Sequence, residues 1–505
     1  MQILRWSALV FLFTLAYWPL TLNKRDLLYK IPGGVEECKQ NPYCRHNLIF
    51  FPIQLVIEHG DTWGYIYPID YLFSQGIYWD DYRMPGYGVP YAFFRWITGS
   101  REAALWLLAL FQLSIWAVAI GWMLYELSLR GMPKWALIGI NFLLSFSPIA
   151  YYTRLFGTES LTAALSLMGV FLLWKRRFLL AGLVLTWIFF MRPVSGIYIL
   201  PASVWIIYTE KKFLSKSLLY FLSPFVLLEG SWILRNYKLY GDFRPFFGSN
   251  TLMYPFVYSR VDYPIISYAS LLGEGDVSKR SEMGSIYNVL YCHSFSPPSI
   301  AVLKQVVPEW AFCSACPPES LQKAAMLGCE LAHSAAYSID PPESLYYGRA
   351  YKDLLYFVTH ISPTPEDCWR EAEMMRILGK CIRCAVHNGN KIEARLYKIK
   401  KMITQTAYKP SYSERIMGSI RAKVKRVYYL AYYVIQMLSI VASLVLLFST
   451  PGNVLASTFN LLPIVTYLSL GLLERRYLDI LFPVSSLCMN IFLLQLREYL
   501  YGKGK

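Results

Sequence analysis

Long apolar stretches recur along this chain, and their length limits what it can fold into. A helix needs about 20 mostly apolar residues to cross the hydrocarbon core of a bilayer. Ten stretches approach that length, and the fifth and sixth are short. They lie near residues 6–22, 104–128, 135–152, 158–174, 178–191, 194–208, 215–233, 428–449, 455–473 and 477–496. The pattern predicts an all-α polytopic membrane protein with about ten transmembrane helices.

The composition supports a membrane protein and excludes several other classes. Charged residues make up only 16% of the chain and hydrophobic residues 55%, whereas soluble domains carry about 25% charged residues. A single soluble core, a disordered chain and a small disulfide scaffold are therefore excluded. The formal net charge is +16. In a membrane protein such an excess favours anionic membrane lipids and phosphate-bearing lipids as partners, and we expect no nucleic acid partner.

The distribution of Lys and Arg predicts the orientation, because short cytoplasmic loops of membrane proteins carry the excess of positive charge. A cytoplasmic N-terminus places twelve basic residues inside and four in the short outside connections. The inside set is Arg5, Arg130, Lys134, Lys175, Arg176, Arg177, Lys211, Lys212, Lys216, Arg497, Lys503 and Lys505, and the outside set is Arg154, Arg192, Arg475 and Arg476. No small-residue cleavage site follows the first stretch, so we expect an uncleaved span. The absence of an Asn-x-Ser/Thr sequon favours a bacterial inner membrane.

Two long polar regions then face outward and divide the chain into three parts. Residues 1–234 form a transmembrane module whose first outer loop covers 23–100, residues 235–427 form an extracytoplasmic domain, and residues 428–505 form the C-terminal transmembrane helices. We expect the outer domain to be mostly helical. It ends in a basic stretch, which is interpreted either as an amphipathic helix lying on the head groups or as a patch that attracts phosphate near a lipid carrier.

Nine of the ten cysteines fall in the two outer regions. An outward compartment permits disulfides, and Cys38 with Cys44 is the most economical pair. The CSAC (313–316) and CIRC (381–384) motifs allow a second interpretation, because four thiolates from two such pairs can hold zinc. Both interpretations are structural, and disulfides are favoured because the gap between the two motifs is long for a compact zinc site.

Five clusters of polar residues adjoin the predicted outer ends of the spans, where ionisable groups are functional candidates. They comprise Asp61, Trp63, Tyr65, Asp70, Arg83, Pro85, Gly86 and Tyr87 of the first loop; Arg154, Gly157, Thr158 and Glu159; Arg192 and Pro193; Arg235 and Asn236; and Arg475, Arg476, Tyr477, Asp479 and Pro483. Each has a structural alternative. Thr158 is a suitable N-cap, with Glu159 complementing the helix dipole, and Arg192 could snorkel to the interface.

The chain resembles the membrane glycosyltransferases of the GT-C superfamily that use polyprenyl-phosphate sugars. Bacterial protein-mannosyltransferase-like proteins and the aminoarabinose transferases acting on lipid A are the nearest in pattern. The resemblance covers the first 250 residues and the last 80 or so, and rests on five pieces: DTWGYIYPIDYLFSQGIYW, RMPGYGVPYAF, GTESLTAAL, WILRNYKLYGDF and ERRYLDILFP. The chain departs from the family pattern at Gly88, where a proline is usual, and in its large Cys-rich outer region.

The resemblance implies specific roles for residues of these motifs. Asp61 matches the catalytic carboxylate of the first outer loop, and Glu159 matches the acidic residue that begins the fourth span. The implied donor-phosphate residues are Arg83, Arg192, Arg235, Asn236, Arg475, Arg476 and Tyr477. The implied sugar and acceptor pocket consists of Trp63, Tyr65, Asp70, Pro85, Gly86 and Tyr87.

The implied reaction is an inverting transfer of a sugar from a polyprenyl-phosphate donor to a lipid, glycan or protein acceptor. Asp61 would act as general base on the acceptor hydroxyl, and arginines would stabilise the charge on the departing phosphate. We expect neither a cofactor nor a required metal. The alternatives are a transporter or flippase for a lipid-linked or sugar substrate, which would suit Glu229 within a span, and a scaffold with a degenerate core. The one-sided clusters and the lack of an internal repeat argue against a transporter.

Overall fold

The computed structural model describes residues 2–20, 63–75, 84–240, 299–307, 309–338, 365–388, 418–469 and 476–501. Every regular element within these ranges is an α-helix or a 3-10 helix, and none is a strand. The predicted all-α class is therefore confirmed for the described residues. Three described helices are long and apolar enough to cross a membrane, over Arg101–Leu129, Lys216–Lys238 and Leu478–Leu500. They belong to α7 (Arg101–Leu129), α13 (Lys216–Tyr240) and α24 (Arg476–Tyr501).

A bent helix pair is the fourth candidate span. The sequence predicts one helix over 135–152. In the structure α8 (Lys134–Ser145) ends at Ser145. The segment formed by α9 (Pro148–Tyr151) and η1 (Tyr152–Arg154) then continues at an angle of 52° to α8. The hydroxyl of Ser147 accepts a hydrogen bond from the amide of Ala150 at 3.2 Å, and Pro148 occupies the first helical position. An N-cap followed by proline starts a new helix, which explains the break.

Shorter apolar helices complete the N-terminal half. They are α1 (Gln2–Leu20), α10 (Glu159–Trp174), α11 (Phe178–Met191), η2 (Pro193–Tyr198) and α12 (Ile199–Glu210). Helix α1 packs along α7, and a Cβ placed at Gly121 would lie 2.6 Å from the backbone nitrogen of Ser7. A Cβ at Gly182 would likewise meet the carbonyl of Phe221, so α11 and α13 approach closely. Small residues permit such close helix packing in membranes.

The C-terminal helices α22 (Gly418–Leu446), α23 (Pro451–Ser469) and α24 pack on one another, and α24 also packs on α10. Buried polar side chains join the three. Asn460 Nδ2 donates to Ser443 Oγ at 2.8 Å, and Ser485 Oγ donates to Asn460 Oδ1 at 2.6 Å. Gln436 Nε2 donates to the carbonyl of Leu478 at 2.5 Å. These bonds satisfy polar groups that would otherwise be costly inside the bundle.

Two predicted boundaries fall inside helices. The boundary at 234/235 lies within α13, and the boundary at 427/428 lies within α22. Both helices continue beyond their apolar stretch, since a helix ends where its backbone is capped rather than where its side chains become polar. Part of the predicted amphipathic helix, from Gly418, is thus continuous with the apolar helix that follows it.

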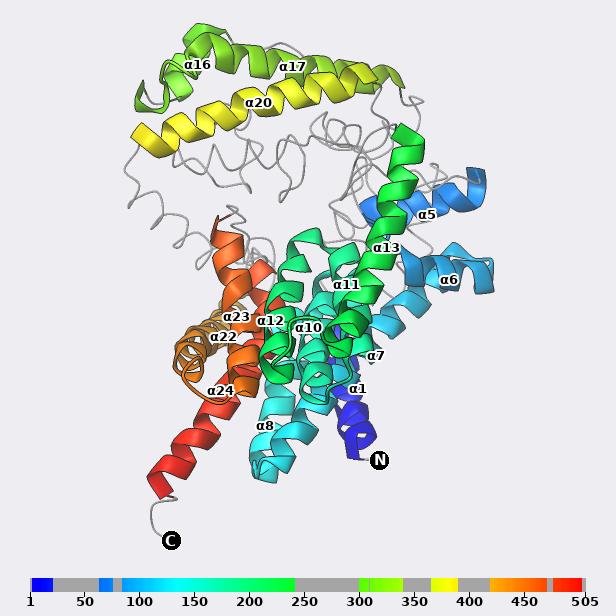
Figure 1. The fold of residues 1–505 in the computed structure, drawn as a ribbon, viewed down its shortest axis with the longest axis vertical. Helices are drawn as coiled ribbons and strands as arrows, with labels where there is room; N and C mark the ends of the chain where they lie inside the picture. Colours follow the sequence, from blue (N-terminus) through cyan, green and yellow to red (C-terminus); the bar gives the residue numbers. More distant parts are fainter. Residues whose placement is uncertain are drawn as a thin grey trace.

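Apart from the ends of α13 and α22, the described part of the outer domain is a helical hairpin above the bundle (Figure 1). Its elements are α16 (Ile300–Val306), η4 (Glu309–Ala311), α17 (Pro318–Ser338) and α20 (Pro365–Asn388). Disulfides join Cys313 to Cys384 and Cys316 to Cys381, with Cα–Cα distances of 5.8 Å and 5.0 Å. The structure therefore pairs the CSAC and CIRC motifs by disulfides, in agreement with the favoured interpretation. Cys38 and Cys44 lie outside the described residues.

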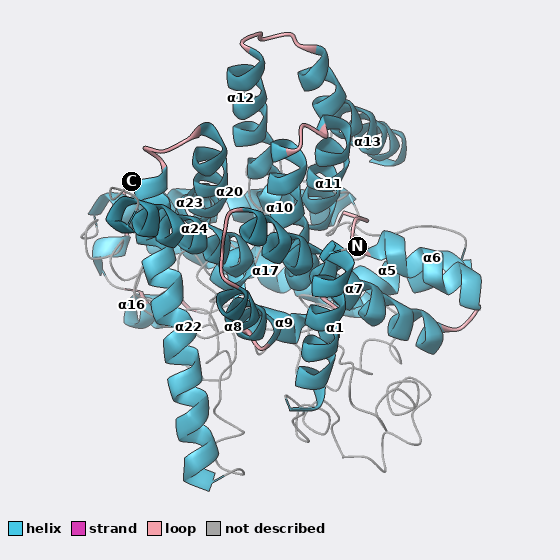
Figure 2. Ribbon diagram, turned by 90° about the horizontal axis from the view of Figure 1, so that it is seen from below, coloured by secondary structure: helices cyan, strands magenta, loops and turns pink. Residues whose placement is uncertain are grey.

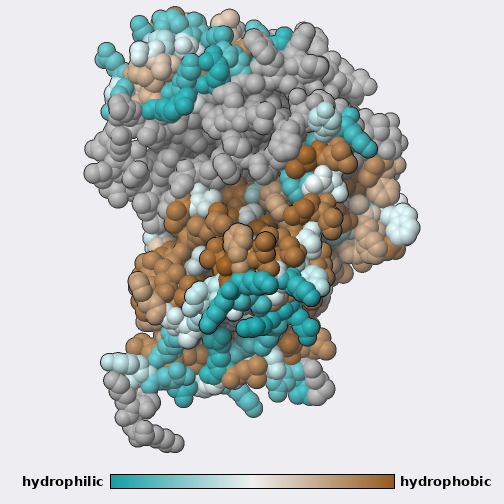
Figure 3. All heavy atoms as spheres, viewed as in Figure 1, coloured by the Kyte–Doolittle hydropathy of each residue, from teal (hydrophilic) through white to brown (hydrophobic). Residues whose placement is uncertain are grey.

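Two short helices of the first outer loop lie across the upper end of α7 (Figure 1). These are α5 (Trp63–Gln75) and α6 (Gly88–Thr98). Helix α6 exposes Val89, Phe93 and Trp96, and Trp96 is 72% exposed. On the face of the bundle seen in the space-filling view, apolar residues form a band and hydrophilic residues gather below it (Figure 3). Exposed aromatic side chains such as Phe93 and Trp96 are typical of the membrane interface.

Candidate functional site

The Pro-Gly-Tyr turn of the first outer loop docks on the last turn of α11. The amide of Gly86 donates to the carbonyl of Phe190 at 3.1 Å, and Trp187 Nε1 donates to the carbonyl of Gly86 at 2.7 Å. A Cβ at Gly86 would collide with the backbone of Phe190 and lie 2.5 Å from the nitrogen of Met191. Only glycine fits at so close an approach. Gly86 therefore determines the position of Tyr87, the residue that follows it.

That next residue, Tyr87, is completely buried. Its ring packs on Tyr65 of α5 with centroids 5.0 Å apart, and its hydroxyl donates to Gln112 Oε1 at 3.0 Å. Burial, followed by the negative charge of Glu159, raises the pKa of Tyr87 well above its ordinary value of 10.0. Tyr87 therefore remains protonated and acts as a hydrogen-bond donor.

Gln112 of α7 is a residue that the sequence analysis missed. It is completely buried, and its amide donates to the carbonyls of Leu155 at 3.2 Å and Thr153 at 3.4 Å. It thus joins the Tyr87 hydroxyl to the connection that precedes α10. The sequence does contain a signal for this residue, since Gln112 is an uncharged polar residue within the apolar stretch 104–128. A polar side chain in such a stretch needs a hydrogen-bond partner.

Glu159 and Arg192 come together at the ends of neighbouring helices. Arg192 Nη1 lies 3.7 Å from Glu159 Oε1 and donates to Thr158 Oγ1 at 3.2 Å. Both charged side chains are about 5% exposed. Thr158 occupies the predicted N-cap position of α10, but its side chain makes no capping hydrogen bond. The interpretation that Arg192 snorkels to the interface is wrong, because its buried guanidinium is directed to Glu159 and Thr158.

Arg235 and Asn236 adjoin the same end of α11 through Trp232. The guanidinium of Arg235 lies 4.6 Å from the centroid of the Trp232 ring, and its Nη1 donates to Asn236 Oδ1 at 2.7 Å. The Trp232 ring makes an edge contact with Phe190 at 6.4 Å. Phe190 therefore receives the Gly86 turn on its backbone and the Trp232 ring on its side chain. The last turns of α13 and the first outer loop meet at this residue.

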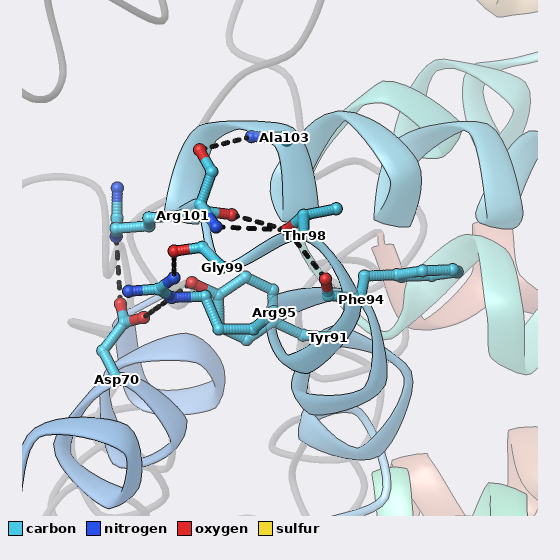
Figure 4. Close-up of polar contacts among 9 residues, drawn as sticks. Asp70, Tyr91, Phe94, Arg95, Thr98, Gly99, Arg101 and Ala103 are labelled. Atoms are coloured by element: carbon cyan, nitrogen blue, oxygen red, sulfur yellow. Dashed lines mark hydrogen bonds and ion pairs between the residues drawn. The ribbon is translucent and has the colours of Figure 1, made fainter.

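Asp70 braces the first outer loop (Figure 4). Its carboxylate lies 2.9 Å from Arg101 Nε and 3.8 Å from Arg95 Nε, and it accepts a hydrogen bond from the Tyr91 hydroxyl at 2.6 Å. Burial and the charge of Asp70 raise the pKa of Tyr91 above its ordinary value. These contacts tie α5 to α6 and α7. The predicted pocket residue Asp70 is thus engaged with three protein side chains.

Several predicted site residues lie outside the described residues or are described only as backbone. Asp61, Arg83 and Arg475 fall outside the described ranges. Trp63 begins α5, and Arg476 and Tyr477 begin α24, but their side chains are not described. Of the remaining candidates, Pro85 lies in the docked turn beside Gly86, where its carbonyl accepts from the amide of Val89 at 3.0 Å.

Glu229 of α13 is buried, with 7% of its surface exposed. Its Oε2 atom has no hydrogen-bond partner among the described residues. Glu229 lies three residues before Trp232 on the same helix. A carboxylate at this depth is a functional candidate by default, and it adds a second acidic group to the helices around Phe190.

The described site combines groups suited to binding an anionic substrate. It contains a protonated tyrosine, a buried Arg–Glu pair and an arginine stacked on tryptophan. Within the described ranges, no three His, Cys, Asp or Glu side chains are grouped so that they could hold a metal ion. Comparison with protein-family models, curated proteins and solved structures finds no match to this chain.

Proposed function

We propose that this protein is a membrane glycosyltransferase of the GT-C type that moves a sugar from a polyprenyl-phosphate donor to an acceptor. One observation carries the proposal: Tyr87, Glu159 and Arg192, which the sequence motifs single out from three separate segments, converge around the end of α11. Arg235 and Asn236 join them through Trp232 and Phe190. Motif residues from four parts of the chain thus share one end of the bundle.

The proposed topology has ten spans, a cytoplasmic N-terminus and the site on the outer face of a bacterial inner membrane. The described helices support the membrane assignment by their length and apolarity. The short helices α10 and α11, at 16 and 14 residues, would span with the aid of the interfacial residues that flank them. The large outer domain, which includes the disulfide-linked hairpin, would stand above the site and contribute to acceptor selection.

In the proposed reaction Asp61 takes the proton from an acceptor hydroxyl as that oxygen attacks the anomeric carbon. The bond between the anomeric carbon and the phosphate oxygen breaks, and polyprenyl phosphate departs with an additional negative charge. Arg235 is suited to stabilise that charge, because its guanidinium is held by Trp232 and Asn236 and a preorganised cation acts without reorientation. Arg83, Arg475, Arg476 and Tyr477 are proposed to assist.

Glu159 and Arg192 have a different proposed role. Their charges offset each other at 3.7 Å, so the pair adds little net charge to the phosphate site. Burial makes such a pair costly unless it is further hydrogen bonded, which Thr158 provides for Arg192. We propose that Glu159 holds Arg192 in place and accepts hydrogen bonds from sugar hydroxyls, while protonated Tyr87 supports the site from the buried side.

The experiment that tests the proposal measures transfer of label from polyprenyl-phosphate sugars in membranes containing this protein. Asp61→Asn should abolish transfer, since an amide cannot accept the proton, while protein abundance stays unchanged. A lipid-scrambling assay in vesicles tests the transporter alternative. Scrambling of a labelled polyprenyl-phosphate sugar by both the parent and Asp61→Asn, with no transfer by the parent, would overturn the glycosyltransferase assignment.

A further inference from the structure

We infer that the protein binds anionic phospholipid head groups at two helix turns on the end of the bundle opposite the candidate site. The turns are the α10–α11 turn and the α12–α13 turn. They carry six basic residues, called here the basic turn pair: Lys175, Arg176, Arg177, Lys211, Lys212 and Lys216. All six are exposed. The inference is independent of the proposed function, because none of these residues belongs to the site around Phe190.

An ion pair holds the two turns together. Arg176 Nη1 of the first turn lies 3.6 Å from Glu210 Oε1, which belongs to the last residue of α12. Figure 2 shows both turns at the end of the molecule that is seen from below. Six cations on separate loops would repel and spread apart, whereas this contact brings the two groups of three into one surface.

The two carboxylates near this surface are already engaged. Lys175 Nζ lies 2.9 Å from Glu126 Oε1, and Arg176 pairs with Glu210. Arg177, Lys211, Lys212 and Lys216 form no ion pair with a described carboxylate. Those four cations are available to several anionic oxygens at once, and phosphate offers oxygens that guanidinium and ammonium groups bind well.

The backbone at both turns is held in a conformation that favours glycine. Arg176 has φ +53° and Lys211 has φ +50°, and these are the only positive-φ non-glycine residues in the described ranges. At Arg176 the amide of Arg177 donates to the carbonyl of Leu172 at 2.8 Å, a helix-ending pattern in which glycine is the usual residue. Glycine would be less strained at both positions, yet each carries a cation, which indicates that the positive charges of Arg176 and Lys211 have a function.

Apolar side chains beside the cations indicate a lipid rather than a soluble anion. Phe213 and Leu214, next to Lys212, are 72% and 68% exposed, and Leu179 and Leu180, two and three residues after Arg177, are 47% and 51% exposed. Basic groups at the head-group level with adjacent apolar groups in the acyl layer match both parts of a phospholipid. The surface also continues the apolar outer face of α13, on which Leu219 is 58% exposed.

The test uses the full chain purified in detergent micelles that contain increasing mole fractions of phosphatidylglycerol in place of phosphatidylcholine. A ligand that binds the folded state raises the unfolding temperature, so the mole fraction giving half of the rise reports the affinity. The test variant is Lys211→Gly with Lys212→Gln, which removes two of the four available charges, relieves the positive φ at Lys211 and leaves the Arg176–Glu210 ion pair in place. It should fold at least as well as the parent in phosphatidylcholine, and its half-rise should require roughly 30-fold more phosphatidylglycerol.

The matched control is Arg5→Gln with Lys134→Gln, which removes two exposed charges at the same end of the molecule but outside the basic turn pair. Its response should equal that of the parent. Equal losses in both double variants would overturn the inference in favour of diffuse charge attraction. A parental response in Lys211→Gly with Lys212→Gln would also overturn it. If inorganic phosphate or pyrophosphate gave the same rise as the lipid, the surface would be a soluble-anion site and the lipid assignment would be wrong.

Discussion

Gly86 determines how closely the first outer loop approaches α11. Replacing it with alanine forces a methyl group into the backbone of Phe190 and Met191. Overpacking of this kind costs about 1–3 kcal/mol, and relief requires Tyr87 to move away from Gln112. We therefore expect Gly86→Ala to lower the unfolding temperature and to reduce sugar transfer, measured side by side on purified protein.

The control for Gly86 is Gly230→Ala. A Cβ at Gly230 of α13 meets nothing within 4 Å, so alanine should be neutral or slightly stabilising there, as it is in exposed helix positions. Loss of stability in both variants would mean that the contact at Gly86 is not special. Unchanged stability and transfer in Gly86→Ala would contradict the docked turn.

The Tyr87 hydroxyl is expected to matter more for function than for stability. Tyr87→Phe and Tyr91→Phe each remove one buried hydroxyl donor, to Gln112 and Asp70 respectively. Tyr87→Phe should destabilise by about 1–3 kcal/mol, because Gln112 Oε1 loses its buried donor. Tyr91→Phe should cost less, because Asp70 keeps Arg101 and Arg95 as partners. Only Tyr87→Phe should reduce transfer by roughly 10-fold to 100-fold, since it alone frees the groups around Glu159. Equal loss of transfer in the two variants would remove Tyr87 from the site.

Single residues also show where sequence reasoning fails. The motifs located Gly86, Tyr87, Glu159 and Arg192, and the structure brings their segments together at the end of α11. Gln112 was missed because no motif surrounds it and its partners, the carbonyls of Thr153 and Leu155, are more than 40 positions away. A partner chosen by tertiary packing cannot be recognised from local pattern, and only its polarity within an apolar stretch points to it.

At the scale of elements, Asn460 joins the three C-terminal helices. Its side chain bonds Ser443 of α22 and Ser485 of α24. Asn460→Leu should destabilise this bundle by about 1–3 kcal/mol, since interhelical hydrogen bonds in membranes contribute about 0.6 kcal/mol each and up to 1.7. Denaturant unfolding in detergent measures the loss.

Asn490 provides the comparison, because its amide bonds the carbonyl of Ser486 within its own helix at 2.7 Å. Asn490→Leu should therefore leave the packing of α24 on α22 intact and cost less. If the two variants were equally stable, the hydrogen bonds of Asn460 would contribute nothing to helix association.

The stability of the outer hairpin should depend on pH through the titration of Glu373. Hydrogen bonds from Arg376 and Lys323 lower the pKa of Glu373 from 4.5 to about 2. A depressed folded-state pKa stabilises the hairpin above the unfolded pKa, and that contribution is lost as pH falls from about 4.5 towards 2. Hydrogen exchange of α20 amides, corrected for intrinsic rates, should accelerate in this window.

Glu373→Gln should remove that acceleration, since an amide does not titrate. Glu330→Gln, which removes a half-exposed carboxylate paired with Arg370 at 3.3 Å, is the control and should keep it. Acceleration that survives in Glu373→Gln would assign the pH response to other carboxylates of the outer domain.

At the scale of the whole molecule, the alternation of helices separates two chemical ends. Helix α10 runs from Glu159 to the basic turn pair, and α11 returns to Arg192. The lengths of the apolar stretches predicted most of these helices, because a helix that is buried or in contact with lipid must be made mostly of apolar residues. It did not predict the break at Ser147 and Pro148 or the extension of α13 and α22 into polar sequence, since caps and side-chain contacts decide those ends.

The proposed ten-span topology has an even number of crossings and therefore predicts that both ends of the chain lie on one side of the membrane. In Figure 1 the labelled start of α1 and the lower end of α24 lie toward the same end of the molecule, as that topology requires. Fusions of alkaline phosphatase, active only outside the cytoplasm, should be active after Gly99 and inactive after Lys212 and after Lys505. If both short segments 178–191 and 194–208 failed to cross, the C-terminal fusion would remain inactive. An active C-terminal fusion would mean that one of them fails alone, and the predicted ten-span topology would then be wrong.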